Sequence, residues 1–263
     1  MPQLDFRQPR LFVDAALAAG ETVALERSQS NYLGNVLRLS AGDTILVFNG
    51  RDGEWQASIE GRKRADHLKI VTQNRPQDRL PNLAYVFAPL KHARFDYMVQ
   101  KAVELGVSRL QPILTQHTQV KRVNVDRLRA NAIEAAEQCG VLSIPEISEP
   151  LTFGRALAAR KPERLLVFCD EDADVNGPLT ALADGRESPT AMLPLTMAGA
   201  ADAGPQPIAL LIGPEGGFAE EERAALLKLP NMVRLSLGPR ILRADTAAVA
   251  ALALIQAVLG DWR

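Results

Sequence analysis

The chain has 263 residues, of which 47% are hydrophobic and 23% charged, and its formal net charge at pH 7 is −1. This is the composition of an ordinary globular protein, with room for one large domain or two smaller ones. No run of about 18 or more apolar residues occurs, which excludes a membrane-spanning helix. The first residues lack the apolar core of a signal peptide. We therefore expect a cytoplasmic protein that makes no membrane contact.

Residue types that bind metals are few and scattered. The two cysteines, Cys139 and Cys169, have no metal-like spacing, and the three histidines, His67, His92 and His117, form no cluster. We expect two free thiols and no metal.

Positive charge is concentrated in the middle of the chain. Residues 81–130 carry 8 basic and 3 acidic side chains, whereas residues 131–263 carry 11 and 18. A basic middle in a neutral protein is either a phosphate-facing patch or a solvated helix face, and composition leaves both open.

Residues 1–75 contain short runs of β-forming residues separated by turn residues. The clearest runs are 21–26, 43–50 and 54–61, with a short helix within 29–43. A small barrel is the natural closure for such strands. Pro76 and Pro81 lie in a stretch without apolar periodicity and mark the boundary to a second domain, residues 76–263.

The second domain alternates between apolar runs typical of buried strands and segments with helical spacing. The predicted strands are 83–88, 109–115, 164–170, 207–213 and 233–238. The predicted helices are 92–106, 124–140, 218–229 and 245–260. This alternation favours an α/β fold with a mostly parallel sheet covered on both faces. Residues 184–207, rich in Pro, Gly, Ala and Ser, are interpreted as a flexible surface insertion.

The segment GPEGGF at 213–218 places one carboxylate, Glu215, among residues that shape the backbone. Its three glycines permit close approaches that a Cβ would block, and the acidic run at 220–222 suits the first turn of a helix. That acidic start, and the lack of any Lys or Arg among the glycines, weigh against a phosphate-binding loop. A neutral or cationic ligand fits the loop better.

The segment LGPRILR at 237–243 also joins a strand to a helix. Its loop carries Arg240 and Arg243, and Asp245 or Thr246 is expected to cap the helix. The alanine-rich helix is a tightly buried core helix in one interpretation. In the other, it also forms a helix-on-helix contact in a dimer.

Several segments, in this order along the chain, resemble a single family. They are PRLF at 9–12, NVLRLSAGD at 35–43, QKAVELGV at 100–107, EAAEQCG at 134–140, GPEGGF at 213–218 and LGPRILR at 237–243, the last followed by Thr246-Ala247. Together they resemble the bacterial 16S rRNA uridine-N3 methyltransferases of the SPOUT superfamily, over nearly the whole chain.

The resemblance implies a PUA-like RNA-binding β-barrel over residues 1–75. It implies a SPOUT methyltransferase domain over 76–263, an α/β domain with a trefoil knot, and a homodimer. The implied cofactor is S-adenosylmethionine. The cofactor-binding residues carried over are Leu211, Ile212, Gly213, Glu215, Gly216, Gly217, Leu237, Gly238, Ile241, Leu242 and Thr246.

The implied reaction methylates N3 of a specific uridine in 16S rRNA of the small ribosomal subunit. Uracil N3 carries a proton at neutral pH, and its loss spreads negative charge onto the flanking carbonyl oxygens. A nearby arginine would stabilise that charge. Arg243 is the first catalytic candidate and Arg240 the second, and either is equally a phosphate clamp. Glu215 either fixes its loop by accepting backbone N–H groups or orients the cofactor or the base.

The implied RNA contacts are basic side chains, which would make binding strongly salt-dependent. The candidates are Arg10, Arg38, Lys91, Arg94 and Lys101, with Arg62, Lys63 and Arg64 as further possibilities.

Two alternatives stay open. One is a SPOUT enzyme that methylates a ribose 2′-hydroxyl of tRNA or rRNA, and the other is a non-catalytic RNA-binding module. The sequence also departs from the family pattern, with Val141 and Leu142 where a basic residue often follows EQCG and Asp245 where glutamate is usual.

Overall fold

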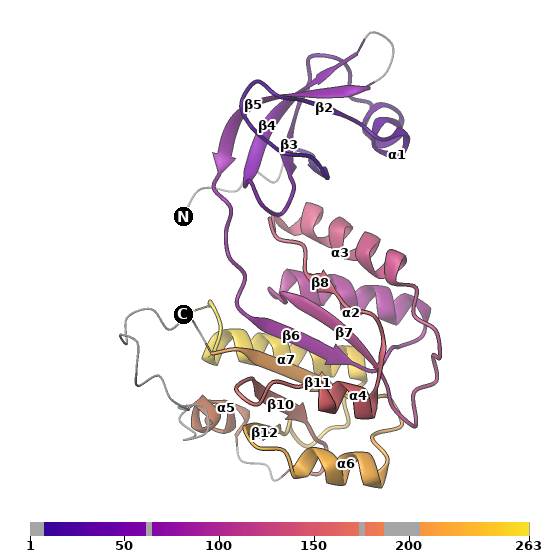
Figure 1. Cartoon of the computed structure of the whole chain (residues 1–263), viewed down its shortest axis with the longest axis vertical. Helices are drawn as coiled ribbons and strands as arrows, with labels where there is room; N and C mark the ends of the chain where they lie inside the picture. The colour runs from indigo at the N-terminus through magenta and orange to yellow at the C-terminus, as the bar shows by residue number, and fades with distance from the viewer. Residues whose placement is uncertain (1–7, 62–64, 174–176, 187–205, 263) are drawn as a thin grey trace. The chain divides into compact units, whose positions relative to one another are not determined.

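The computed structural model describes residues 8–61, 65–173, 177–186 and 206–262 (Figure 1). The chain divides into two compact units. The barrel unit comprises Met1–Arg79 and Ile133–Ile144, and the α/β unit comprises Leu80–Ala132 and Pro145–Arg263. The predicted ranges, 1–75 and 76–263, place residues 133–144 in the second domain instead.

The barrel unit contains a five-stranded sheet in the order β1-β3-β4-β5-β2. Its strands are β1 (Arg10–Phe12), β2 (Thr22–Ala24), β3 (Thr44–Phe48), β4 (Glu54–Glu60) and β5 (His67–Arg75). Strands β3, β4, β5 and β2 pair antiparallel in turn, while β1 joins β3 in parallel. This curled sheet fits the predicted barrel. Strands β1 and β5 were not predicted from the sequence.

Buried and more exposed residues alternate along the strands of this unit, and the buried side chains form its core. Ala57 and Ile59 of β4, and Leu68 and Ile70 of β5, are almost fully buried, and the residues between them are more exposed. A period of two is what a half-buried strand requires. The predicted helix is shorter than expected, with α1 (Arg27–Asn31) continuing into the π-helical turn η1 (Tyr32–Val36).

The α/β unit is built on a parallel sheet in the order β12-β10-β11-β6-β7-β8, with β9 also paired to β7. The strands are β6 (Leu83–Phe87), β7 (Arg109–Leu114), β8 (Glu146–Ile147), β9 (Leu151–Thr152), β10 (Leu165–Cys169), β11 (Ile208–Ile212) and β12 (Met232–Leu235). Every pairing in this sheet is parallel, which confirms the predicted fold class. The trefoil knot stays a prediction.

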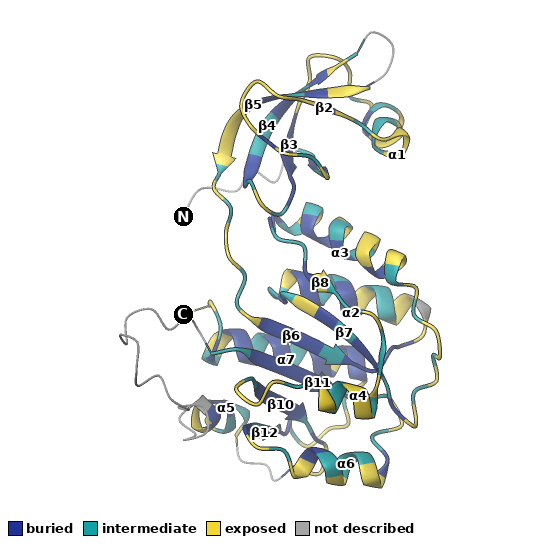
Figure 2. Cartoon of the chain, in the orientation of Figure 1, coloured by how far each residue is buried: buried dark blue, intermediate teal, exposed yellow. Residues whose placement is uncertain are grey.

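Helices cover both faces of the parallel sheet, whose central strands are the buried layer in Figure 2. The helices of this unit are α2 (His92–Glu104), α4 (Phe153–Ala158), α5 (Pro178–Arg186), α6 (Glu220–Leu227) and α7 (Ala244–Val258). Helix α3 (Val125–Cys139) begins in this unit and ends in residues 133–144 of the barrel unit. On one face α2 packs beside α7, and Tyr85 of β6 donates a hydrogen bond to the Met98 sulfur, 3.0 Å away. On the other face, side chains of α4 and α6 pack against Leu166 and Leu211.

Local signals account for several helix boundaries. Asn124 precedes α3, and its side-chain oxygen accepts the backbone N–H of Arg127 at 2.9 Å, the contact of a helix N-cap. The prediction for α7 was wrong, because the helix begins at Ala244 with Arg243 as its N-cap. Asp245 instead lies in the first turn and accepts the N–H of Thr246.

The predicted insertion overlaps helix α5. Asp184 to Arg186 form the end of α5, residues 206 and 207 lead into β11, and 187–205 lie outside the described residues. In the part of the chain that the structure describes, no helix is both long and apolar enough to cross a bilayer.

Candidate functional site

Three loops of the α/β unit line an open cavity of about 530 Å³. The loops follow β10, β11 and β12, which are neighbours in the sheet. Because the carboxyl ends of parallel strands meet at one edge, segments far apart in sequence come together there. The volume lies within the range of small-molecule sites.

The GPEGGF loop after β11 needs its first glycine for packing. A Cβ on Gly213 would lie 2.6 Å from Cε2 of Phe218, so the Phe218 ring occupies the space that a side chain would take. That ring packs edge-on against Phe168 of β10, with 5.4 Å between ring centroids. Gly217 has a φ of 70° and donates its N–H to the carbonyl of Pro214. The Phe218 ring therefore anchors the end of the loop, and the positive φ of Gly217 allows the turn before it.

Side chains from two other segments hold this loop from outside. Arg94 of α2 forms an ion pair with Glu215, and both side chains are about half exposed. His117 Nδ1 lies 3.1 Å from the carbonyl oxygens of both Gly216 and Gly217. Because a carbonyl only accepts hydrogen bonds, Nδ1 is the protonated nitrogen. Among the described residues, the partner of the Glu215 carboxylate is the Arg94 guanidinium.

The LGPRILR loop forms the facing wall. Leu237, Leu242 and both arginines line the cavity. The Arg243 side chain is 66% exposed, with its Nε 3.9 Å from a carboxylate oxygen of Asp245. Its guanidinium is therefore free to turn toward a ligand.

Most of the residues predicted to bind a cofactor meet at this cavity. Those that line it are Ile212, Gly213, Glu215, Gly216, Gly217, Leu237, Gly238, Ile241 and Leu242. Leu211 belongs to the core beside α4 and α6, because successive strand residues point to opposite faces. Thr246 is exposed in the first turn of α7 and does not line the cavity.

The third wall of the cavity, formed by the loop after β10, was not predicted from the sequence. Cys169, Asp170, Glu171 and Asp172, with Arg223 of α6, also line the cavity. A run of acids directly after a buried strand was the available signal. Burial raises the pKa of Cys169 to about 12, so its thiol stays protonated and is no nucleophile at neutral pH.

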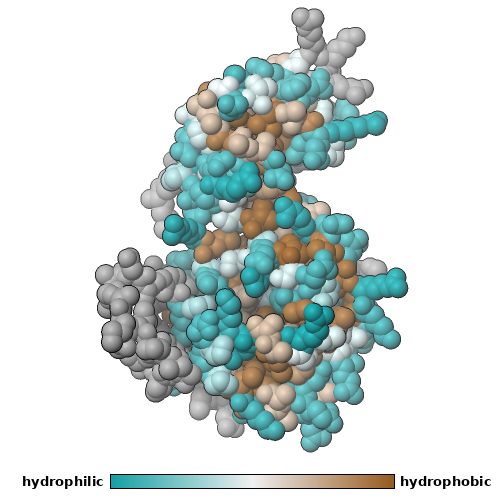
Figure 3. All heavy atoms as spheres, in the orientation of Figure 1, coloured by the Kyte–Doolittle hydropathy of each residue, from teal (hydrophilic) through white to brown (hydrophobic). Residues whose placement is uncertain are grey.

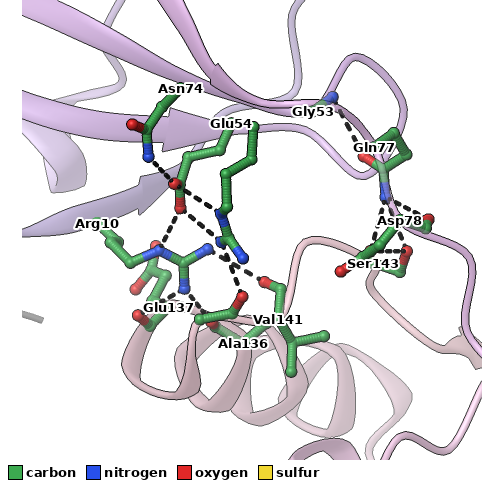
Figure 4. Close-up of polar contacts among 12 residues, drawn as sticks. Arg10, Gly53, Glu54, Asn74, Gln77, Asp78, Ala136, Glu137, Val141 and Ser143 are labelled. Atoms are coloured by element: carbon green, nitrogen blue, oxygen red, sulfur yellow. Dashed lines mark hydrogen bonds and ion pairs between the residues drawn. The ribbon is translucent and has the colours of Figure 1, made fainter. Parts of the chain in front are cut away.

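The structure accounts for Arg10 without RNA. Arg10 is 9% exposed, its Nε binds Glu54 at 2.8 Å, and Nη1 donates to the carbonyls of Ala136 and Glu137 at the end of α3 (Figure 4). Carbonyls in the last turn of a helix are commonly satisfied by side chains. Arg10 is thus a structural cap within the barrel unit, and its RNA-binding assignment is not retained.

The same contacts explain why residues 133–144 belong to the barrel unit. Arg75 donates to the carbonyl of Gly140 at 2.9 Å, and Glu137 accepts the backbone N–H of Phe12 at 2.8 Å. Two sequence segments, PRLF and EAAEQCG, therefore contact each other.

The other predicted RNA contacts differ in their surroundings. Arg38 and Lys91 are exposed, Arg94 is paired with Glu215, and Lys101 binds Glu104 at 2.7 Å. Residues 62–64 lie outside the described residues. Figure 3 shows hydrophobic residues interspersed with hydrophilic ones over the face in view. Among the described residues, no group of three or more His, Cys, Asp or Glu side chains is placed to hold a metal ion.

Two models of known protein families match the sequence of this chain. A family model described as an RNA methyltransferase domain matches residues 77–256, and one described as an RNA methyltransferase PUA domain matches residues 25–69.

Relatives match over nearly the whole chain. A Synechocystis protein named ribosomal RNA small subunit methyltransferase E is 33% identical, over 95% of this chain and 78% of its own length. A Rickettsia conorii protein of the same name is 27% identical over 94% of each chain.

Solved structures agree with the sequence relatives. The crystal structure of ribosomal RNA small subunit methyltransferase E from Neisseria gonorrhoeae, bound to S-adenosyl methionine, has a TM-score of 0.77 and 25% identity. It covers 98% of this chain and 100% of its own. A putative methyltransferase from Legionella pneumophila, in complex with the same cofactor, has a TM-score of 0.75 and 28% identity, over 95% of this chain and 98% of its own.

Proposed function

The chain belongs to the RNA methyltransferase family, and from this premise we propose that it methylates small-subunit ribosomal RNA with S-adenosylmethionine as methyl donor. The finer proposal is that the acceptor is N3 of a uridine in 16S rRNA. The observation that carries the proposal is the meeting of the GPEGGF and LGPRILR loops around one cavity.

The residues of the cavity suit this cofactor. The 213–218 loop contains no basic side chain, so it places no positive charge of its own beside a cationic sulfonium. Ile212, Leu237 and Leu242 offer apolar surface of the kind that small-ligand pockets use for orientation. Two relatives of known structure carry S-adenosyl methionine, which supports the same ligand here.

The chain's contribution to the chemistry is position and charge. When bound, the cofactor supplies an electrophilic methyl group. Arg243 and Arg240 lie on the wall of the cavity and are exposed, so a uracil that enters would meet a guanidinium. As N3 loses its proton, that guanidinium would stabilise the negative charge on the uracil oxygens. Arg243 remains the first candidate and Arg240 the second.

RNA binding is assigned to exposed basic residues. Arg38 of the barrel unit and Lys91 beside α2 are the candidates that no ion pair occupies in the described part of the chain. Arg94 and Lys101 would first exchange an acidic partner for phosphate. Since the proposed substrate is ribosomal RNA, we assign the enzyme to the cytoplasm.

Homodimerisation is part of the same proposal. Ile241 is 92% exposed at the tip of the LGPRILR loop, and an exposed large apolar residue beside a site is consistent with cover from a second copy. The buried alanines of α7 support the core-helix interpretation, since Ala248 and Ala251 are buried within the unit itself. Sedimentation of the intact protein tests the assignment.

The decisive experiment uses small ribosomal subunits from a strain that lacks the modification. Incubation with methyl-labelled S-adenosylmethionine should label 16S rRNA, and digestion to nucleosides should yield 3-methyluridine. A label on ribose would indicate the 2′-hydroxyl alternative. Binding of RNA without any transfer would indicate a non-catalytic module.

A further inference from the structure

A buried carboxylate joins the three segments that enclose the cavity. Asp170 follows β10, and its side chain is 3% exposed. It accepts hydrogen bonds from Arg223 Nη2 at 2.9 Å and from Arg234 Nε at 2.8 Å. Arg223 belongs to α6, after the GPEGGF loop, and Arg234 belongs to β12, before the LGPRILR loop. One acid therefore links all three walls.

The loop after β10 is shaped by the same contacts. The backbone N–H of Asp172 donates to Asp170 at 3.2 Å, and Arg234 Nη2 donates to the carbonyl of Asp172 at 2.7 Å. The Asp172 carboxylate lies 3.6 Å from Arg223 Nε and is 70% exposed. Arg223 thus meets one buried and one exposed acid, whereas Arg234 pairs with the buried one.

The acidic loop after β10 and its two arginine partners form a charged cluster that influences which ligand the cavity prefers. Three carboxylates (Asp170, Glu171 and Asp172) and two guanidiniums (Arg223 and Arg234) give a formal charge of −1. Without Asp170 the buried negative charge disappears and both arginines lose their common partner. The cavity wall would then favour a cation less.

We infer that Asp170 is a positioning and specificity-determining residue. It holds Arg223 and Arg234 in place and masks their charge, so that the cavity prefers a cationic sulfonium ligand over its neutral thioether form. The inference rests on the proposed function, because it takes S-adenosylmethionine as the ligand. S-adenosylhomocysteine, which lacks only the methyl group and the sulfonium charge, is the matched neutral probe.

The test is calorimetric titration of the full chain with both ligands at low ionic strength. The readout is the ratio of the dissociation constant of S-adenosylmethionine to that of S-adenosylhomocysteine. Asp170→Asn should raise this ratio roughly tenfold, because the loss of one negative charge from the cavity wall weakens the attraction for the cation and not for the neutral ligand. Arg234→Gln should lower it, because it removes a positive charge and leaves Asp170 paired with Arg223.

Further variants separate charge from folding. The double variant Asp170→Asn with Arg234→Gln restores the cluster charge to −1, so its ratio should return toward that of the wild type even if both affinities are weaker. Asp170→Glu should keep the wild-type ratio. Glu220→Gln, which removes an exposed acid of α6 that does not line the cavity, is the matched control and should leave the ratio unchanged.

The Arg234→Gln variant keeps the inference testable if Asp170→Asn does not fold. Equal changes for the two ligands in the Arg234→Gln protein, or a ratio that does not follow the cluster charge, would overturn it. Binding of neither ligand by the wild-type protein would instead contradict the proposed function.

Discussion

At the scale of single residues, the contact between Arg94 and Glu215 links helix α2 to the GPEGGF loop of the cavity. Both side chains are about half exposed, so the pair contributes about 0.2–1 kcal/mol to stability. Glu215→Gln and Arg94→Gln should each lower the rate of RNA methylation several-fold, because the loop loses its outer support, while the melting temperature changes little.

The matched control is another exposed ion pair of the same unit. Arg109 and Glu146 are 48% and 60% exposed and lie away from the cavity. Arg109→Gln should leave methylation unchanged. Normal transfer and normal cofactor affinity in the Glu215→Gln protein would refute any role for this carboxylate.

Glu54 determines how the barrel unit responds to acid. It is 1% exposed between Arg10 and Arg75. Burial by itself raises the pKa of Glu54, but hydrogen bonds from Arg75 and Asn74 and the charge of Arg10 outweigh burial and hold that pKa below its ordinary value of 4.5. The stabilisation is therefore complete above pH 4.5 and is lost as the pH falls through the lower folded-state pKa.

A substitution at Glu54 should remove this acid dependence. Glu54→Gln leaves two largely buried guanidiniums without their carboxylate, so unfolding should become easier by about 3–5 kcal/mol at neutral pH. Urea unfolding at several pH values should show that the free energy of unfolding falls less steeply with decreasing pH than in the wild type. An equally steep decrease of the free energy of unfolding in the variant would assign the acid sensitivity to another group.

Substitutions at Arg10 and Arg38 should have different effects on protein stability and on the salt dependence of RNA binding. Arg10→Gln should destabilise the protein, since several acceptors lose their donor, without changing the salt slope of RNA binding. Arg38→Gln should leave stability within about 0.5 kcal/mol and reduce the salt slope by about one. Filter binding at several salt concentrations distinguishes them, and a reduced slope in a folded Arg10→Gln protein would reinstate Arg10 as a contact.

At the scale of the element, the turn after β11 depends on close packing at Gly213. Gly213→Ala places a Cβ 2.6 Å from the Phe218 ring, which must move and take the loop with it. We expect weaker binding of S-adenosylmethionine by about tenfold or more, measured by calorimetry. Gly154→Ala in α4 is the control, because nothing lies within 4 Å of its added Cβ. Undiminished affinity in the Gly213→Ala protein would show that the loop is not part of the site.

Elements with a strong local signal could be predicted from the sequence, and those without one could not. The parallel strands and long helices of the α/β unit follow apolar runs and helical spacing. The short strands β8 and β9 have only two residues each, which is too few for any periodicity. Strand β5 was missed because only its first half alternates, whereas Val71 to Asn74 are all exposed.

At the scale of the whole molecule, sequence motifs indicated where the site lies but not how it is held together. The glycine-bearing loops were predicted to meet, and they line one cavity. The link through Asp170 was not predictable, because its partners are 53 and 64 residues away and meet it only through the strand order. The burial of Arg10 was equally hidden, since a sequence does not reveal that a basic side chain is enclosed by its own fold.

The central claim is that the loops after β10, β11 and β12 form the S-adenosylmethionine site of an RNA methyltransferase. A crystal structure of this chain grown with the cofactor tests it most directly. We expect electron density for the cofactor between residues 213–218 and 237–243, with the sulfonium on the side of the acidic loop that follows β10. Density for the cofactor elsewhere on the protein, or a phosphorylated nucleotide in that cavity, would contradict the account.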